Sequence, residues 1–256
     1  MPPETYPRVP EIGHLTIGEI FASLKAGLQD FRAAPMFGVF FSSVYVISGF
    51  LLIQLGAGTF TWTLTLSLGF PLVAPFAAVG LYEVSRRLEA GLPLSWGEIL
   101  AVVWHSRGGQ IPWLGAIILI YFMFWTFLAH MIFALFMGPY ALIDPTWSFD
   151  MFLTQRGAAL GMAELLIGGV SAFFLFSMTA VSLPLLLEHE IDFVTAMLVS
   201  MRATRQNFVV MALWAFVIAA LTVLALLPAF LGLLVVMPVL GHATWHIYRR
   251  VLYLPE

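Results

Sequence analysis

The sequence predicts an all-α, polytopic membrane protein with six transmembrane helices in three hairpins, each preceded by a cytoplasmic-side amphipathic helix. Two observations predict this class. First, 61% of the 256 residues are hydrophobic, only 10% are charged, and the mean hydropathy is +0.96; a soluble domain of this size cannot bury so much apolar surface. Second, one succession of amphipathic segment and apolar hairpin recurs along the chain, which indicates an internal threefold repeat.

Six apolar runs are long enough to cross a bilayer, which takes roughly 20 residues. The predicted spans cover about 36–55, 60–82, 112–136, 158–187, 207–228 and 230–248. The last two come from one uncharged run, 209–241, for which a single kinked span is the alternative; we place a turn at 227–232. Residues 1–14 form a polar tail without an apolar run, so we expect no cleavable signal peptide.

The basic residues predict the orientation. All eleven Lys and Arg lie outside the predicted spans, and ten of them lie on one side, with Arg156 alone on the other. Because cytoplasmic loops carry the excess of Lys and Arg, both termini are predicted to be cytoplasmic. The pairs Arg86-Arg87 and Arg249-Arg250 are assigned to this topogenic role, at the headgroups.

Three segments between the spans have helical amphipathic spacing, around residues 17–31, 96–104 and 194–201. The first two begin with capping-box patterns, Thr16-x-x-Glu19 and Ser95-x-x-Glu98. We interpret the three segments as helices in the headgroup plane. They either pack on the bundle and fix the hairpins or form a docking collar for lipid or a partner protein.

The repeat is clearest in two stretches, PFAAVGLYEVSRR from Pro75 and PVLGHATWHIYRR from Pro238. In each, a proline precedes an Arg-Arg pair by eleven residues, and an aromatic residue follows the proline by seven. We therefore divide a single membrane domain, 1–256, into units of about 15–88, 94–188 and 190–250, after a cytoplasmic tail of residues 1–14.

Glu164 is the acidic residue that lies well inside a predicted span, and His130 lies at similar depth on the span before it. A carboxylate in hydrocarbon is costly and is a functional candidate by default. The two side chains are therefore candidates for a proton or ligand site. The alternative is a hydrogen-bonded or protonated glutamate that locks the hairpin.

His242 and His246 lie four residues apart on the last span and so share a helix face, a spacing that can bind a metal ion or haem. Without an identified third ligand this is a weak metal site, for which His105 is another possible ligand. We expect no cofactor. The alternative is headgroup anchoring beside neighbouring aromatic rings.

Four prolines are candidate hinges: Pro71, Pro75, Pro184 and Pro238. In a membrane helix they favour kinks, and transporters place such breaks at binding sites. Closely spaced glycines at 157, 161, 168 and 169 indicate a close-packing span and predict a central place in the bundle for it.

The stretch GFPLVAPFAAVGLYEVSRR, residues 69–87, is distinctive. It resembles the signature of a family of bacterial predicted integral membrane proteins, domain of unknown function 2189, over about Ile17 to Arg250. The resemblance implies an uncharacterised inner-membrane protein. It implies no catalytic residues.

The sequence contains no phosphate-binding glycine loop, zinc-protease motif, nucleophile elbow or basic tract suited to nucleic acid. We therefore expect a non-catalytic scaffold, assembly or accessory protein of a membrane complex or its lipids, whose partners are the lipid bilayer and a membrane protein or a bound lipid. The alternatives are a small-molecule or ion transporter or channel using Glu164 and His130, and a redox or metal enzyme using His242 and His246.

Overall fold

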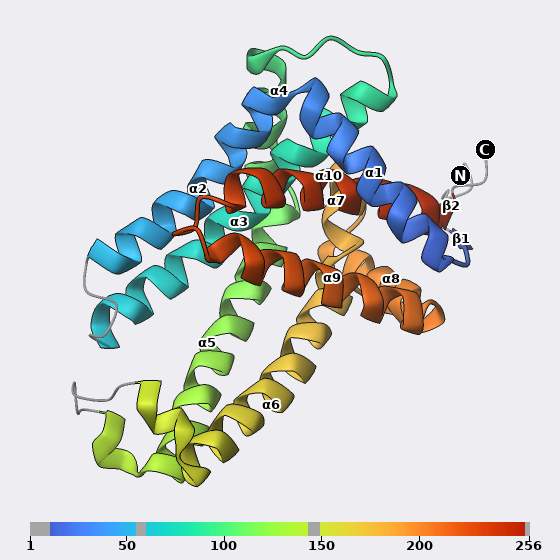
Figure 1. Ribbon diagram of the computed structural model, residues 1–256. Coiled ribbons are helices and arrows are strands. Elements are labelled where there is room, and N and C mark those ends of the chain that lie inside the picture. The colour runs from blue at the N-terminus through green and yellow to red at the C-terminus, as the bar shows by residue number, and fades with distance from the viewer. Residues whose placement is uncertain (1–10, 55–59, 143–148, 254–256) are drawn as a thin grey trace.

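The computed structural model describes residues 11–54, 60–142 and 149–253, which are mostly helical (Figure 1). The α-helices are α1 Ile17–Ala33, α2 Pro35–Gln54, α3 Phe60–Glu89, α4 Trp96–His105, α5 Ile111–Met137, α6 Gln155–Thr179, α7 Ser182–Glu188, α8 Phe193–Gln206, α9 Phe208–Leu226 and α10 Leu233–Val251. Short 3-10 turns lie at Ser106–Gly108 (η1), Pro139–Leu142 (η2) and Phe149–Leu153 (η3). The prediction of an all-helical membrane protein is confirmed.

Three pairs of long helices form hairpins: α2 with α3, α5 with α6, and α9 with α10 (Figure 1). Short helices precede each hairpin, α1, α4 and α8 respectively. Among the described residues, three helices are long and apolar enough to cross a membrane: α5, the continuous stretch Gln155–Glu188, and α9. A fourth span results if the bent pair α1–α2 counts as one, so six spans and a threefold repeat stay predictions.

The turn predicted at 227–232 is confirmed, because α9 ends at Leu226 and α10 begins at Leu233. Ala229 and Phe230 adopt the left-handed conformation, with φ of 50° and 66°. This backbone reversal sends α10 back along α9 (Figure 1). Residues 209–241 therefore form two helices and not a single kinked one.

The break between α1 and α2 follows from Pro35. Proline cannot donate a backbone hydrogen bond, and it disfavours the helical conformation in the residue before it. Ala34 accordingly leaves the helical region, with φ −136° and ψ 54°, and the two helices meet at 104°. This bend lays α1 across α10 while α2 begins its hairpin with α3 (Figure 1).

The centre of the molecule is α10, which contacts α1, α2, α3 and α9. Trp245 and Tyr248 of α10 and Trp214 of α9 are among the largest fully buried side chains. At Gly27 of α1 the nearest atoms belong to the backbone of another helix: a Cβ there would lie 2.5 Å from the Val239 carbonyl oxygen of α10. Backbone therefore meets backbone where α1 crosses α10.

The expectation that the glycine-rich span is central is wrong. Several apolar side chains of α6 are exposed, including Leu165, Leu166 and Val170, and a Cβ on Gly169 would meet nothing within 4 Å. Gly157 instead lets α6 pack against the turn before it, because a Cβ there would lie 2.0 Å from the Met151 carbonyl oxygen in η3. Together α5 and α6 project from the remaining helices (Figure 1); we call this hairpin the α5–α6 arm.

The two ends of the described chain pair in a small antiparallel sheet, β1 Glu11–Ile12 with β2 Leu252–Tyr253. The Asn207 side chain between α8 and α9 reinforces it, since its Oδ1 accepts from the Leu15 backbone N–H at 2.7 Å and its Nδ2 donates to the Gly13 carbonyl at 2.9 Å. Both ends therefore lie on the same side of the molecule, next to the basic end of α10.

The amphipathic helices differ in how they use their apolar stripes. In α8 the small residues Ala196, Ser200 and Ala203 are buried, whereas Val194 and Leu198 of the predicted stripe are exposed. In α1, Ile20 is buried while Ile17 and Phe21 are exposed. These helices thus pack on the bundle with one face and leave apolar side chains on another, as expected of helices at a membrane surface.

Candidate functional site

The Arg-Arg pair of α3 closes on a buried glutamate one turn earlier. Glu83 is fully buried, and its Oε2 and Oε1 atoms lie 2.7 Å from Arg86 Nε and Arg87 Nε. The spacing of three and four residues places all three side chains on one helix face. Hydrogen bonding to Glu83 raises the pKa of both arginines. A buried carboxylate is tolerated here because two guanidinium groups share it.

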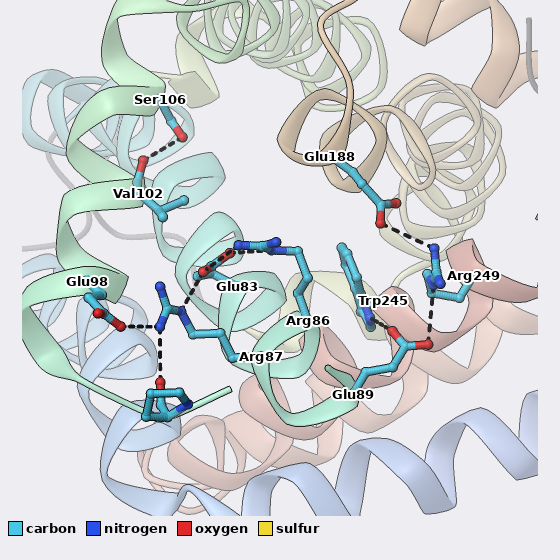
Figure 2. A network of polar contacts seen from close by, with 11 residues as sticks. Glu83, Arg86, Arg87, Glu89, Glu98, Val102, Ser106, Glu188, Trp245 and Arg249 are labelled. Carbon is cyan, nitrogen blue, oxygen red and sulfur yellow. Dashed lines mark hydrogen bonds and ion pairs between the residues drawn. The ribbon is translucent and has the colours of Figure 1, made fainter. Parts of the chain in front are cut away.

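Arg87 extends this group to the next helix. Its guanidinium pairs with Glu98 of α4 and donates to the Pro93 carbonyl at 3.0 Å (Figure 2). Ser95 caps α4 by accepting from the Glu98 backbone N–H at 3.3 Å. The Glu98 carboxylate reaches Arg87 instead of completing the capping box that its spacing predicts. By contrast, the predicted box of Thr16 and Glu19 is present in full.

A second set of polar contacts joins α3, α7 and α10. Arg249 lies 3.3 Å from Glu89 Oε1 and 3.2 Å from Glu188 Oε1 (Figure 2). Trp245 Nε1 donates to Glu89 at 3.0 Å, and the Tyr248 hydroxyl donates to Glu188 at 2.5 Å. Glu83, Arg86, Arg87, Glu89, Glu98, Glu188 and Arg249 together are called the polar base below. The polar base holds four helices, α3, α4, α7 and α10, in one place.

Corresponding residues of the first and third predicted repeat units meet in the core. Tyr82 and Trp245, the aromatic residues that follow Pro75 and Pro238 by seven positions, pack with ring centroids 6.5 Å apart. Their helices also supply one arginine pair each to the same face. Tyr82 and Trp245, which hold corresponding positions in the two units, therefore contact each other directly.

His242 and His246 take part in a third polar group, between α1, α3 and α10. Asp30 Oδ2 accepts from the Ser85 hydroxyl at 2.7 Å and lies 2.9 Å from His246 Nε2. His242 Nδ1 lies 2.8 Å from Ser85 Oγ. Ser85 and His242 are fully buried, so no substrate reaches this serine, although its neighbours are of the types found in hydrolases.

Among the described residues, no group of three or more His, Asp or Glu side chains is arranged to hold a metal ion. The suggested third ligand, His105, lies on α4, where its Nδ1 is 2.7 Å from the Ala101 carbonyl oxygen. Through their contacts with Ser85 and Asp30, His242 and His246 take part in the packing of α10 against α3 and α1.

Glu164 and His130 lie on α6 and α5 of the arm, which pack against each other. Both side chains are partly buried, and they are close enough to interact electrostatically. His130 Nδ1 also lies 2.7 Å from the Thr126 carbonyl oxygen. The structure therefore brings this predicted pair together, on the part of the molecule farthest from the polar base (Figure 1).

The candidate hinge prolines lie inside or at the start of helices. The α3 helix runs without interruption through Pro71 and Pro75, and α10 runs through Pro238; the Pro71 side chain is outside the described residues. The helix is interrupted before Pro184, between Thr179 and Ser182, and Pro184 occupies the first turn of α7. Their role as hinges stays a prediction.

Sequence reasoning missed Glu83, Asp30, Ser85, Glu89 and Glu188. Glu83 was detectable, because a glutamate three and four residues before two arginines pairs with them on a helix. Asp30 and Ser85 carry no such signal, since they are 55 positions apart and meet only after α1 crosses α10.

Residues 63–188 match the family described as "Predicted integral membrane protein (DUF2189)". The resemblance stated from residues 69–87 is thereby confirmed over residues 63–188, and its wider extent, from about Ile17 to Arg250, stays a prediction. No curated protein and no solved structure matches the chain.

Proposed function

We propose that the chain, whose residues 63–188 match this family of predicted integral membrane proteins, is a non-catalytic accessory protein that scaffolds or assembles a membrane complex or organises its lipids. The observation that carries this proposal is the polar base. Its charged side chains pair with one another across α3, α4, α7 and α10, which suits the fastening of helices better than the binding of a substrate.

The exposed surface supports the same role. The arm presents large apolar side chains along its length, among them Trp113, Phe124, Phe127 and Leu165. Such a surface is stable in lipid or against another membrane protein. A rigid base with a projecting apolar hairpin is an arrangement suited to holding a partner within the bilayer.

The proposed location is the bacterial inner membrane, with both termini in the cytoplasm. The excess of Lys and Arg on one side supports this orientation, as does the pairing of β1 with β2, which keeps both ends on one side. We further propose six spans in three related units. The threefold succession of a capped short helix and a helical hairpin supports it, with Thr16, Ser95 and Asp192 at the N-caps.

Purification from the native membrane in mild detergent, followed by mass spectrometry of all copurifying species, tests the proposal. We expect a protein partner in reproducible stoichiometry. Recovery of a clean, lipid-independent monomer that still performs the cellular role would contradict it. Tyr140 and Leu153, exposed at the tip of the arm, suit a crosslinking probe that locates the contact.

The second candidate function is a transporter or channel that uses Glu164 and His130. The observation that favours it is the interaction of these two ionisable groups across α5 and α6. Cation flux into proteoliposomes tests this function, and Glu164→Gln should abolish the flux or shift its pH dependence. The control is Glu11→Gln, at an exposed glutamate outside the helices, which should leave the flux unchanged. Equal flux in both variants would remove Glu164 from any transport mechanism.

A further inference from the structure

A cleft opens between α4, the start of α5 and the end of α7. Its volume is about 420 Å³, which is within the range of roughly 300–1,000 Å³ typical of ligand pockets. Its polar lining comes from His105, Ser106, Gln110 and Glu190, and its apolar lining includes Leu186 and Leu187. The cleft is apart from the polar base and from the Glu164–His130 pair.

The ends of two apolar helical stretches indicate where across the bilayer this cleft lies. Ile111, which lines the cleft, is the first residue of α5, and Glu190 follows directly on the stretch Gln155–Glu188. Where such stretches end, hydrocarbon gives way to the headgroup region. The cleft therefore lies where the phosphate and the polar headgroup of a phospholipid are found.

One side of the cleft is basic and continues into a shallower depression. His105 lines both hollows, and Trp104, Arg107 and Gly108 complete the second. The Arg107 guanidinium lies 3.0 Å above the centre of the Trp104 ring, which holds the cation in place at the mouth of the cleft. Arginine beside an aromatic ring at the interface is well suited to a phosphate group.

The other side of the cleft is acidic. Glu190 is exposed and lines the cleft together with Gln110. The Gln110 Oε1 atom accepts from the Phe193 backbone N–H at 3.4 Å, which directs the amide of this side chain. The cleft thus presents the Glu190 carboxylate at one side, and at the other the His105 imidazole with the Arg107 guanidinium in the adjoining depression, over an apolar lining from α7.

We propose that this cleft binds the phosphoethanolamine headgroup of a membrane phospholipid. The phosphate lies toward His105 and Arg107, the ammonium group donates hydrogen bonds to Glu190, and the glycerol region contacts Leu186 and Leu187. A phosphatidylglycerol headgroup has no cation to offset Glu190. A choline headgroup has a cation but no N–H to donate, so neither satisfies both sides of the cleft.

The test uses the full chain, purified, stripped of lipid and offered an equimolar mixture of phosphatidylethanolamine, phosphatidylglycerol and phosphatidylcholine. Native mass spectrometry counts the lipid retained. We expect the wild-type protein to retain phosphatidylethanolamine preferentially. Glu190→Gln should reduce its preference over phosphatidylglycerol by roughly tenfold, the size of one charge-assisted hydrogen bond. The matched control, Glu11→Gln, should keep the wild-type ratio.

Arg107→Gln should weaken retention of all three lipids, because all three carry the phosphate, whereas Arg32→Gln in the last turn of α1 should leave retention unchanged. Water-soluble glycerophosphoethanolamine, offered at the same concentration, should not displace the lipid. A folded Glu190→Gln protein with the wild-type lipid ratio would overturn the proposal, as would equally tight binding of the soluble compound. Since the readout is lipid alone, it is independent of whether a protein partner copurifies.

Discussion

The polar base and the α5–α6 arm differ in what their charged side chains contact. In the base, Glu83 is fully buried and touches two arginines, one of which reaches another helix. In the arm, Glu164 is only partly buried and its ionisable neighbour is His130, on the adjoining helix of the same hairpin. The base links helices that are distant in sequence, whereas the arm is held together by its own two helices.

This difference shows where rigidity comes from in a chain with so few charges. Apolar side chains have little preference for one another over lipid, so helix packing alone leaves an apolar hairpin free to change neighbours. Ion pairs and close backbone crossings, by contrast, form only between particular residues, and so they fix the positions of the helices relative to one another. Both are concentrated at one end of the molecule, while the arm carries apolar side chains that lipid or a partner can cover.

The largest expected effect comes from removing the carboxylate at the centre of the base. Glu83→Ala should lower the free energy of unfolding by about 3 kcal/mol, because it leaves the mostly buried Arg87 without this partner. Thermal unfolding in detergent measures it, with the exposed Glu11→Ala as control. An unchanged melting temperature would mean that the base does not hold the helices; if the alanine variant fails to fold, Glu83→Gln supplies the comparison.

The next effect concerns the crossing of α1 and α10. Gly27→Ala should destabilise the protein by about 1–3 kcal/mol, because its Cβ would press on the Val239 carbonyl and the Ala243 backbone. Gly97→Ala in α4 is the matched control, since nothing lies within 4 Å of a Cβ there. Helix propensity predicts that this control is neutral or up to about 1 kcal/mol more stable. The same loss in both variants would refute a tight crossing at Gly27.

The arm should respond weakly to a similar change. Glu164→Gln is expected to alter the free energy of unfolding by at most about 1 kcal/mol, and toward stability, since an amide enters hydrocarbon more readily than a carboxylate. The same unfolding assay applies. A loss as large as that of Glu83→Ala would place Glu164 among the groups that hold the fold, and the contrast between base and arm would disappear.

The smallest effect is a pH dependence at the start of α8. Hydrogen bonds from Thr195 lower the pKa of Asp192, whose Oδ1 accepts from the Thr195 backbone N–H at 2.9 Å. A lowered pKa stabilises the fold above the unfolded value of about 3.9, and this contribution is lost as the pH falls through the folded value. The melting temperature of wild type should therefore exceed that of Asp192→Asn near pH 6 and approach it below pH 3. A constant difference would contradict this assignment.

Periodicity and length predicted the helices well. The proposed spans and amphipathic segments correspond to α1, α2, α3, α4, α5, α6 with α7, α8, α9 and α10, and the turn at 227–232 was placed from one proline and one glycine in an uncharged run. These signals are local, because an apolar run and its breaker residues act within a few turns of helix.

Which helix lies at the centre was not predictable in the same way. The glycines of α6 favour close packing, yet the backbone-to-backbone approach of α1 and α10 is at Gly27, in an amphipathic segment. A small residue permits close packing but does not specify the partner. The partner of Gly27 is fixed by the bend at Pro35 and by Asp30 reaching Ser85 and His246.

The charged residues show the same limit. The distribution of arginines predicts the orientation of the chain across the membrane. It does not predict whether a given arginine lies at the lipid headgroups or inside the protein. Arg86 and Arg87 pair with the buried Glu83. Arg249 pairs with both Glu89 and Glu188. Only the short-range part of this arrangement, Glu83 with its two arginines, could have been inferred from spacing.

The docking of α1 on α10 also constrains the order of events during synthesis. The first helix of the chain packs against the last, and the strand before α1 pairs with the strand after α10. Translation delivers the N-terminal end first, so α1 can contact α2 and α3 early but lacks its main neighbour until α10 has been made. During that interval its exposed Ile17 and Phe21 give it a place to rest on the lipid surface. Synthesis of α10 and β2 then allows α1 and β1 to dock, so the packing of the bundle is completed late in translation.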